Sequence, residues 1–465
     1  MTTPQGAEAL EGRNNGLAMQ PTLAGDAQES RATGSSRRYY RFKPWNIGRY
    51  LIWSVFAIAL IVLPHLFKSS LALTMLSQMG YLIIICLSYN ILLGQGGMLS
   101  FGHAVYTGLG SFIAIHAINL ASAGKLPIPL VFMPLVGGLA GMFFAMLFGF
   151  VTTKKSGTTF AMITLGIGEL VASMALMFPT FFGGEGGITM NRVYGQPFMG
   201  ITFGPQIQVY YLIAVYCFVC TGLMYAFTGT PLGRILNAVR DNPERVEFIG
   251  YNTQRVRYFA FIIAGFFAGI GGGLAAINFE IVNAADSLNA IRSGGYLLFT
   301  FLGGAVFFFG PIIGAVLLVF ASVLLSELSK AWQLYFGLVF VFMVMFAPGG
   351  IASLIMMNLR VAKYGKFQRF WGLYAGLIAA LVPVVVGAAA VIEMIYHIQL
   401  NSALGPELRF FGVTLNTDGA VSWVGAIALF AVGMGAFELV RRRFVKTWGR
   451  AQEEIETEIK RREAA

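Results

Sequence analysis

Apolar runs of bilayer-crossing length recur along most of this chain. An α-helix needs about 20 predominantly apolar residues to cross the hydrocarbon core of a membrane. Charged residues make up only 11% of the 465 residues, whereas a soluble protein carries roughly a quarter. The runs lie near residues 50–67, 71–93, 99–119, 128–151, 158–178, 208–227, 257–279, 294–309, 311–328, 331–347, 370–397 and 421–440. We therefore predict an all-α fold, a polytopic integral membrane helical bundle of about 10–12 transmembrane helices with broken or re-entrant segments.

The distribution of basic residues predicts which loops face the cytoplasm. Cytoplasmic loops are the ones that carry an excess of Lys and Arg. The basic intervals are 37–49, 154–155, 229–256, 358–369 and 441–446. Alternating crossings place all of them on one side, with both termini in the cytoplasm. The net charge of +11 is thus explained by membrane topology, and we expect no nucleic-acid partner.

Composition divides the chain into three parts. Residues 1–44 are rich in small, polar and acidic residues, so we expect a disordered cytoplasmic tail. Residues 45–357 hold the main transmembrane domain. Residues 358–465 form a C-terminal extension with two probable transmembrane helices and a charged cytoplasmic tail.

Two segments allow more than one interpretation. The run at 294–309 is short and continues directly into Gly310-Pro311, so the 294–328 region forms either two crossings or a re-entrant hairpin. The glycine-rich external loop 179–207 is either a flexible connector or a docking surface. Composition does not separate these alternatives.

The interval 229–256 is the longest strongly charged segment between two apolar runs. Aliphatic residues recur there at three- and four-residue intervals, which predicts a short amphipathic helix. Asp241-Asn242-Pro243 ends this helix and caps a second one that begins near Glu244. Such a helix–turn–helix either lies on anionic lipid or docks a cytoplasmic protein. Acidic residues between the arginines weaken the lipid alternative, so we favour docking.

The stretch 94–110 places six glycines and several polar side chains at membrane depth. Glycines of this density permit a broken helix, and broken helices with polar side chains commonly line transport paths. Ser100, His103 and Tyr106 are the candidate path residues. Tight helix packing around one hydrogen-bonded histidine is an equally good explanation.

Isolated carboxylates form a second set of candidates. Glu169 lies within an apolar run, and an ionisable group at that depth should face a bundle interior or water. It is a candidate path residue, with a purely structural hydrogen bond as the alternative. Glu280 and Asp286 lie near the predicted outer mouth, where we expect solvated charges.

Several kinds of active site are absent from the sequence. It contains no G-x-x-x-x-G-K-[ST] phosphate loop, no H-E-x-x-H motif and no G-x-S-x-G motif. Its four histidines are scattered, and Cys86, Cys217 and Cys220 lie in apolar runs, as free thiols would. We expect no catalytic site, no metal site and no cofactor in this chain.

Six segments together resemble a known family, the LivM-type permeases. These permeases are membrane subunits of ATP-driven (ABC) importers for branched-chain amino acids and related small polar solutes. The matching segments span about residues 70–356 in the family's order; they are YNILLGQGGMLSFGHAVYTGLGSFIA, KSGTTFAMITLGIGELV, FFGGEGGI, TPLGRILNAVRDNPERVEFIGYNTQRVRYFAFIIAGFFAGIGGGLAA, FLGGAVFFFGPIIGAVLL and YFGLVFVFMVMFAPGGIASL. The extension 358–465 departs from the family pattern and either binds an additional subunit or packs against lipid.

The resemblance implies partners as well as a function. It implies a second, LivH-like permease, two cytoplasmic ABC ATPase subunits that hold ATP-Mg, and a periplasmic solute-binding protein, all at the bacterial inner membrane. Residues 233–250 would be the coupling helix region that seats in an ATPase groove. On this basis the expected coupling residues are Arg234, Arg240, Asp241, Asn242 and Pro243.

We therefore predict alternating-access transport driven by ATP that separate subunits hydrolyse. The alternative is a stand-alone ion- or proton-coupled carrier in which Glu169 relays protons. A membrane enzyme is the third and weakest alternative, because no catalytic constellation is present.

Overall fold

The computed structural model describes residues 47–194, 200–400, 405–410 and 412–464. The chain divides into two compact units, residues 1–54 and 55–465. Of the first unit, only residues 47–54 are described, and they begin helix α2 (Ile47–Leu66). The predicted tail at 1–44 lies outside the described residues.

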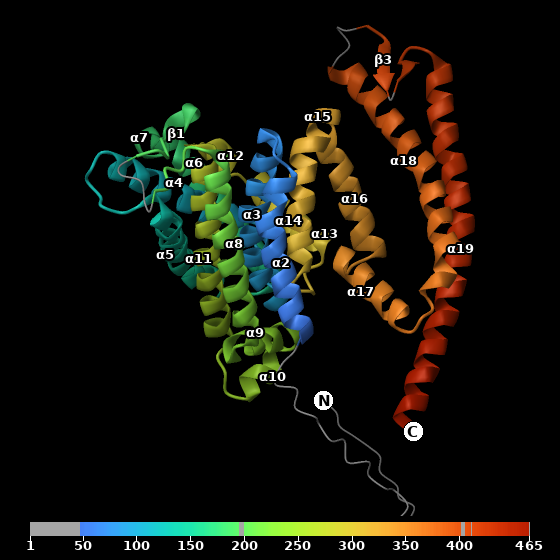
Figure 1. The fold of residues 1–465 in the computed structure, drawn as a ribbon, viewed down its shortest axis with the longest axis horizontal. Helices are drawn as coiled ribbons and strands as arrows, with labels where there is room; N and C mark the ends of the chain where they lie inside the picture. The colour runs from blue at the N-terminus through green and yellow to red at the C-terminus, as the bar shows by residue number, and fades with distance from the viewer. Residues whose placement is uncertain (1–46, 195–199, 401–404, 411, 465) are drawn as a thin grey trace, which may run out of the picture. The chain divides into compact units, whose positions relative to one another are not determined.

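The second unit is almost entirely helical (Figure 1). Its longer helices are α3 (Ser70–Asn90), α4 (His103–Ser122), α5 (Met133–Thr152), α6 (Gly157–Met177), α8 (Gln206–Gly229), α9 (Pro231–Asp241), α11 (Thr253–Phe279), α13 (Ala290–Gly303), α14 (Gly310–Val319), α16 (Trp332–Phe346), α17 (Gly350–Lys363), α18 (Trp371–Leu400) and α19 (Ala420–Ala464). Shorter helical pieces are η1 (Ile91–Gln95), η2 (Leu130–Phe132), α7 (Pro179–Phe182), η3 (Gly184–Gly186), α10 (Pro243–Phe248), α12 (Ala284–Ser287), η4 (Phe320–Leu325), α15 (Ser326–Leu328) and η5 (Phe367–Phe370). Strand β1 (Ile188–Thr189) pairs antiparallel with β2 (Ile281–Val282), and β3 (Glu407–Phe410) with β4 (Val413–Asn416).

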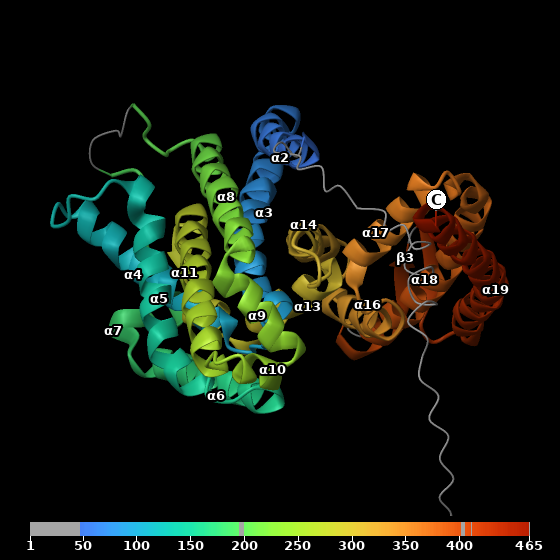
Figure 2. The same cartoon turned by 90° about the horizontal axis from the view of Figure 1, so that it is seen from below.

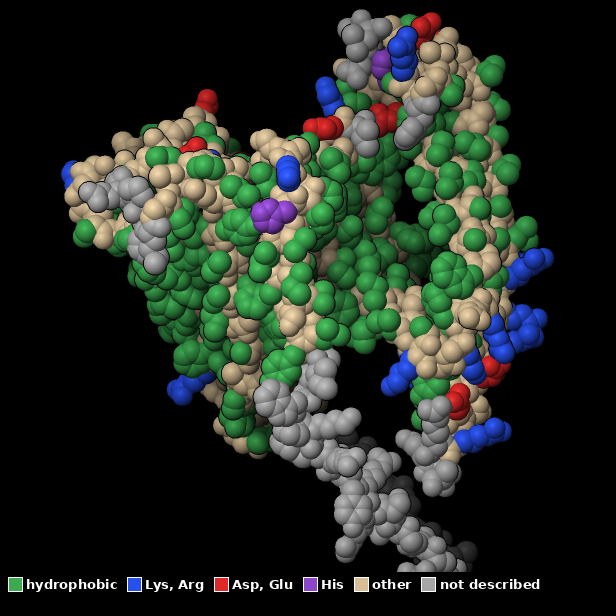
Figure 3. All heavy atoms as spheres, in the orientation of Figure 1, with side chains coloured by type: hydrophobic (Ala, Val, Ile, Leu, Met, Phe, Trp, Pro, Cys, Tyr) green, Lys and Arg blue, Asp and Glu red, His purple; other side chains and the backbone are tan. Residues whose placement is uncertain are grey.

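The helices confirm a polytopic membrane bundle. Within the described residues, eight helices are long and apolar enough to cross a membrane, or up to nine if the bent pair α16–α17 counts as one crossing. The helix at residues 50–66 and the α14–η4 segment are apolar but shorter. These shorter and bent segments, together with α13, occupy the remaining runs in which the sequence predicts crossings. Hydrophobic side chains cover most of the helical surface in Figure 3.

Helices α4, α5 and α11 pack closely through glycines. A Cβ on Gly110 would lie 2.7 Å from the Cα of Gly269, and a Cβ on Gly137 would lie 2.8 Å from the carbonyl oxygen of Gly269. The backbones therefore touch at this crossing, which only small residues permit. This contact holds α4, and the polar residues at its start, in a fixed position in the core.

Helices α13 and α14 form a short hairpin. Helix α13 has 14 residues, which span about 21 Å, less than the roughly 30 Å hydrocarbon core. It ends at Gly304, whose φ of 114° is accessible to glycine. A Cβ on Gly303 would lie 2.7 Å from the backbone nitrogen of Gly314, so the two helices are in close contact. This geometry favours the re-entrant alternative for residues 294–328.

The C-terminal extension contains the two expected candidate spans, residues 367–400 and 420–461. Helices α18 and α19 pack through Gly387 and Gly433, where an added Cβ would lie 2.6 Å and 2.7 Å from backbone atoms of the facing helix. Lys366 forms an ion pair of 2.6 Å with Glu454 near the end of α19. Glu393 of α18 accepts hydrogen bonds from Ser329 and Tyr335, which connect the extension to residues outside it.

Candidate functional site

A buried group of polar side chains surrounds the break between α3 and α4. Tyr89 donates a hydrogen bond of 2.8 Å to the carbonyl oxygen of Ser100, and Nε2 of His103 lies 2.9 Å from Oγ of Ser88. We call Ser88, Tyr89, Ser100 and His103 the polar cluster. All four side chains are buried. The glycines of 94–102 permit the non-helical connection that brings these residues together, with φ of 64° at Gly97.

Two atoms of the polar cluster lack hydrogen-bond partners among the described residues: Oγ of Ser100 and Nδ1 of His103. The Ser88 hydroxyl donates its hydrogen bond to the carbonyl oxygen of Ile85. Nε2 of His103 is therefore the donor to Oγ of Ser88, and Nδ1 of His103 is left as an acceptor. A buried polar atom without a partner costs about 1–3 kcal/mol. An ordered water, a ligand or another conformation would satisfy each of these atoms.

Tyr106 lies one helical turn beyond the polar cluster. Its ring packs edge-on against Phe261, with centroids 5.3 Å apart, and its centroid lies 6.2 Å from that of His103. The structure thus brings together Ser100, His103 and Tyr106, three of the four predicted path residues. It buries all three, so no open passage reaches them in this conformation.

The fourth predicted path residue, Glu169, lies elsewhere. Its helix α6 turns Thr164 inward, where Oγ1 accepts a hydrogen bond of 3.1 Å from the backbone N–H of Phe101. Glu169 is on the opposite, exposed face of α6, so it does not point into the interior of this bundle. No hydrogen bond or ion pair joins it to another described residue. We call the exposed residues on this face the α6 stripe: Thr159, Met162, Gly166, Glu169, Ser173 and Leu176.

The charged interval 229–256 forms the predicted helix–turn–helix, made of α9 and α10. Oγ1 of Thr230 accepts a hydrogen bond from the N–H of Gly233 at the start of α9. Oδ1 of Asn242 accepts one of 3.0 Å from the N–H of Arg245 at the start of α10, with Pro243 as the first helical residue. These are favoured N-terminal capping arrangements. Figure 2 shows the molecule from the end that carries these two helices.

Helix α9 is hydrogen-bonded to the π-helix η1, which lies between Tyr89 and Ser100 of the polar cluster. The Arg240 guanidinium donates a hydrogen bond to the carbonyl oxygen of Gly94. Asn237 donates a hydrogen bond of 2.8 Å to Oε1 of Gln95. Arg240 also forms an ion pair of 2.9 Å with Asp241. Its charged group is therefore directed toward the bundle as well as the surface, which the sequence pattern does not reveal.

Two exposed apolar residues lie at the end of α10. Phe248 is 90% exposed and Ile249 is 69% exposed, while Val246 of the same helix is buried. We call Phe248 and Ile249 the α10 knob. Side chains of this size on an aqueous loop indicate a contact surface for another protein. The sequence predicted a second short helix beginning near Glu244 but did not distinguish these two exposed residues from the buried Val246.

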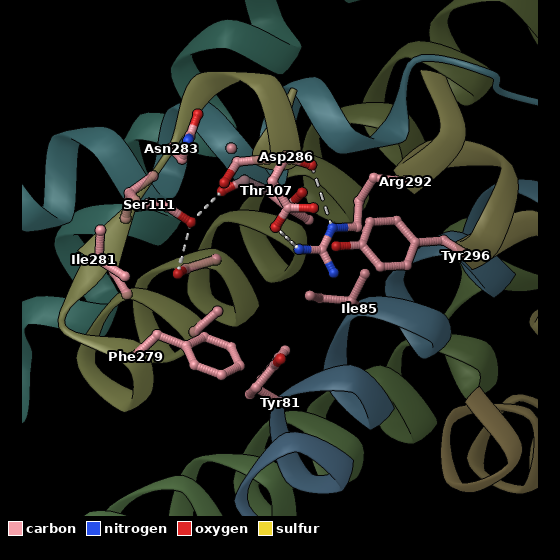
Figure 4. Close-up of a pocket in the computed structure, with 16 residues that line it drawn as sticks. Tyr81, Ile85, Thr107, Ser111, Phe279, Ile281, Asn283, Asp286, Arg292 and Tyr296 are labelled. Carbon is pink, nitrogen blue, oxygen red and sulfur yellow. Dashed lines mark hydrogen bonds and ion pairs between the residues drawn. The ribbon is translucent and has the colours of Figure 1, made fainter. Parts of the chain in front are cut away.

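A cavity of about 260 Å³, which we call the outer cavity, is lined in part by α12, at the end of the bundle opposite α9 (Figures 1 and 4). Helices α3, α4 and α11, the 281–287 segment and α13 contribute its lining. Asp286 and Arg292 form an ion pair within the lining. Glu280 pairs with Arg192 at 3.6 Å. Both carboxylates are exposed to solvent, as predicted, and each also has a cationic partner, which was not predicted.

The chain also matches a known transporter family over more than half of its length. Residues 71–348 match the model of the family described as branched-chain amino acid transport system / permease component. The chain belongs to this permease family. It is a permease subunit of an ABC importer, which confirms the resemblance and counts against the stand-alone carrier.

The chain is also similar in sequence to individual permeases, at identities of 24–26%. The permease protein LivM of the high-affinity branched-chain amino acid transport system of Escherichia coli (strain K12) is 25% identical over 303 residues, which cover 60% of this chain and 69% of that protein. LivM of Salmonella typhimurium is 26% identical with the same coverage. The ribose import permease protein RbsC of Haemophilus influenzae is 24% identical over 322 residues, covering 62% of this chain and 91% of that protein. No solved structure matches the chain.

The family match includes all the sites described above. The polar cluster, the α6 stripe, α9, the α10 knob and the outer cavity lie within residues 71–348. The extension after residue 358 lies beyond the match. As a permease, this subunit has polar groups at three levels: the α9–α10 end of the bundle, its buried centre, and the cavity near the other end.

Proposed function

We propose that this permease imports branched-chain amino acids or a related small polar solute across the bacterial inner membrane by alternating access. A periplasmic binding protein delivers the solute, and two cytoplasmic ABC ATPase subunits supply the energy through α9 and α10. ATP-Mg is held by these subunits and no cofactor by this chain. Both termini are cytoplasmic. The bonding of α9 to η1 is the observation that carries this proposal.

The bonding gives movement of the inner loop a direct route to the buried centre. An ATPase that closes on the α10 knob would displace α9, and the bonds from Arg240 and Asn237 would displace η1 with it. A π-helix is a locally irregular turn, often found at functional sites. The chain leads from η1 through Gly97 to Ser100 and His103, whose unpartnered atoms then become available to a solute.

The five predicted coupling residues have different parts in this scheme. Arg234 is exposed on α9 and contacts the ATPase. Arg240 transmits the movement to η1, and Asp241 pairs with it. Asn242 and Pro243 begin α10 and thereby set the position of the α10 knob.

The α6 stripe supports pairing with a second, LivH-like permease. An acidic side chain facing lipid at the centre of a membrane helix costs roughly 2.5–3.5 kcal/mol. Gly166 and Ser173 on the same stripe allow close approach of another helix. A partner subunit covers this face, and Glu169 lines the path where the two permeases meet.

Reconstitution tests the proposed function. The chain is placed in vesicles with the partners encoded beside it, and uptake of labelled L-leucine is measured with and without ATP and the binding protein. We expect uptake only when the ATPase subunits, ATP and the binding protein are all present. Uptake by this chain alone, driven by an ion gradient and insensitive to ATP, would contradict the proposal.

A further inference from the structure

The outer cavity presents two opposite charges beside an apolar wall. Asp286 and Ile85 both lie next to Arg292, and the Phe279 ring lies across the cavity from them (Figure 4). Thr107 and Ser111 of α4 add hydroxyl groups. A site with a cation, an anion and an apolar surface is complementary to a molecule that carries the same three features.

Arg292 is held in place by the start of α13. Oδ1 of Asn289 accepts a hydrogen bond of 2.7 Å from the N–H of Arg292 and caps the helix. The guanidinium donates to the carboxylate of Asp286 through Nη2. Its Nη1 has no hydrogen bond to any described residue, so it can donate to a ligand.

Both charged groups of this pair are accessible. A guanidinium is protonated at every physiological pH, so Arg292 carries its charge in the cavity. The side chains of Arg292 and Asp286 remain 38% and 68% exposed. A solute that enters the cavity can therefore reach both groups without disrupting the core.

The size of the cavity restricts the ligand to a small molecule. A cavity of about 150 Å³ accommodates benzene, so a volume of about 260 Å³ admits roughly ten non-hydrogen atoms. Gly108 and Gly272 lie in the lining. A Cβ on Gly108 would lie 2.5 Å from a side-chain carbon of Leu288, so the absence of a side chain allows Leu288 to pack directly against α4 beside the cavity.

We propose that the outer cavity is a binding site for a zwitterionic aliphatic α-amino acid, with its carboxylate on Arg292 and its ammonium group on Asp286. The aliphatic side chain packs against Ile85 and Phe279. A neutral sugar offers no charge to either group and leaves the ion pair intact, so the site selects against it. This inference rests on the proposed function and extends it, because the permease itself recognises the solute after delivery.

Binding to the assembled transporter without binding protein tests this site. The complex is placed in lipid nanodiscs, and equilibrium binding of labelled L-alanine, L-valine, L-leucine and L-isoleucine is measured. We expect at least one of them to bind. For L-leucine, 4-methylpentanoate lacks the ammonium group and 3-methylbutylamine lacks the carboxylate. Each should compete about tenfold or more weakly than L-leucine, because one charge-assisted contact is lost, and D-ribose should not compete.

Variants assign the binding to the two charged residues. Arg292→Gln and Asp286→Asn should each weaken amino-acid binding by about tenfold or more. The control is Arg192→Gln, which breaks the nearby ion pair with Glu280 but lies outside the cavity lining and should leave binding unchanged. Arg292→Lys retains the charge and should retain part of the affinity. Co-purification of all subunits checks that each variant assembles.

The outcomes separate this inference from the proposed function. Absence of binding by all four amino acids, equal competition by the singly charged analogues, or unchanged binding by Arg292→Gln would each overturn the site. If ATP-dependent uptake is intact in that case, the importer function stands. If the variants do not assemble, competition by the analogues on the unmodified complex still decides. Absence of ATP-dependent uptake would count against the importer function instead.

Discussion

Helices α9 and α12 lie near opposite ends of the bundle (Figure 1), and each contributes to an arginine–aspartate pair of similar exposure but different surroundings. Arg240 and Asp241 are 34% and 68% exposed, and Arg292 and Asp286 are 38% and 68% exposed. Arg240 also donates to a backbone carbonyl of η1, whereas Arg292 faces a cavity. An exposed ion pair by itself contributes only about 0–1 kcal/mol. What each arginine contacts besides its aspartate therefore distinguishes the two pairs. The bond to η1 makes Arg240 a mechanical connection, and the cavity makes Arg292 part of a binding site.

The largest expected effect is at the inner end, on the α10 knob. Phe248→Asp replaces an exposed aromatic contact with a charge, and central aromatic contacts are worth about 2 kcal/mol or more at interfaces. We expect co-purifying ATPase to fall by about tenfold or more. Glu244→Gln, on the same short helix, is the matched control and should retain the ATPase. If both variants retain equal amounts of co-purifying ATPase, Phe248 does not contribute to docking.

Glu169 provides a contrast to both pairs, because it has no partner among the described residues. Glu169→Leu removes the ionisable group from the α6 stripe, so the chain should remain inserted and assembled while uptake falls severalfold. Glu169→Gln should retain more uptake than Glu169→Leu, because the amide can still form hydrogen bonds. The measurement is ATP-dependent uptake of L-leucine across a range of pH. Unaltered uptake by both variants would assign Glu169 a packing role only.

The smallest effect is expected at Asp241. Asp241→Asn removes an exposed ion pair but leaves the bond from Arg240 to Gly94, so uptake should change by less than about fivefold. Asp286→Asn at the outer end should weaken amino-acid binding more, because that carboxylate is itself a ligand group. The measurements are the uptake of the Asp241→Asn complex and the amino-acid affinity of the Asp286→Asn complex, each divided by the value for the unmodified complex. A larger loss from Asp241→Asn would reverse the assignment of the two pairs.

Local sequence patterns predicted the inner loop well. Asn242 and Pro243 specify the start of α10 through capping, which depends on neighbouring residues only. The glycines between 94 and 102 likewise indicated a broken helix before α4. These features need no knowledge of distant contacts, so the sequence was sufficient to predict them.

Directions of side chains were harder to predict. Arg240 bonds to Gly94, which is 146 residues away in the sequence, and no local pattern predicts that contact. The inward face of α6 was equally hard to predict, because apolar residues lie on both its buried and its exposed faces and their periodicity is weak. The outer pair could have been anticipated: Asp286 and Arg292 are only six residues apart and flank the Asn289 cap.

The central claim is that Arg240 transmits ATPase movement to η1, and the uptake of solute per ATP hydrolysed tests it most directly. Arg240→Gln removes a hydrogen bond from a charged group, worth about 1.5–3 kcal/mol, without altering the α10 knob. We predict that the reconstituted complex retains its ATPase subunits and hydrolyses ATP within about twofold of the normal rate, while uptake falls by about tenfold or more. Uptake per ATP equal to that of the unmodified complex would contradict the account.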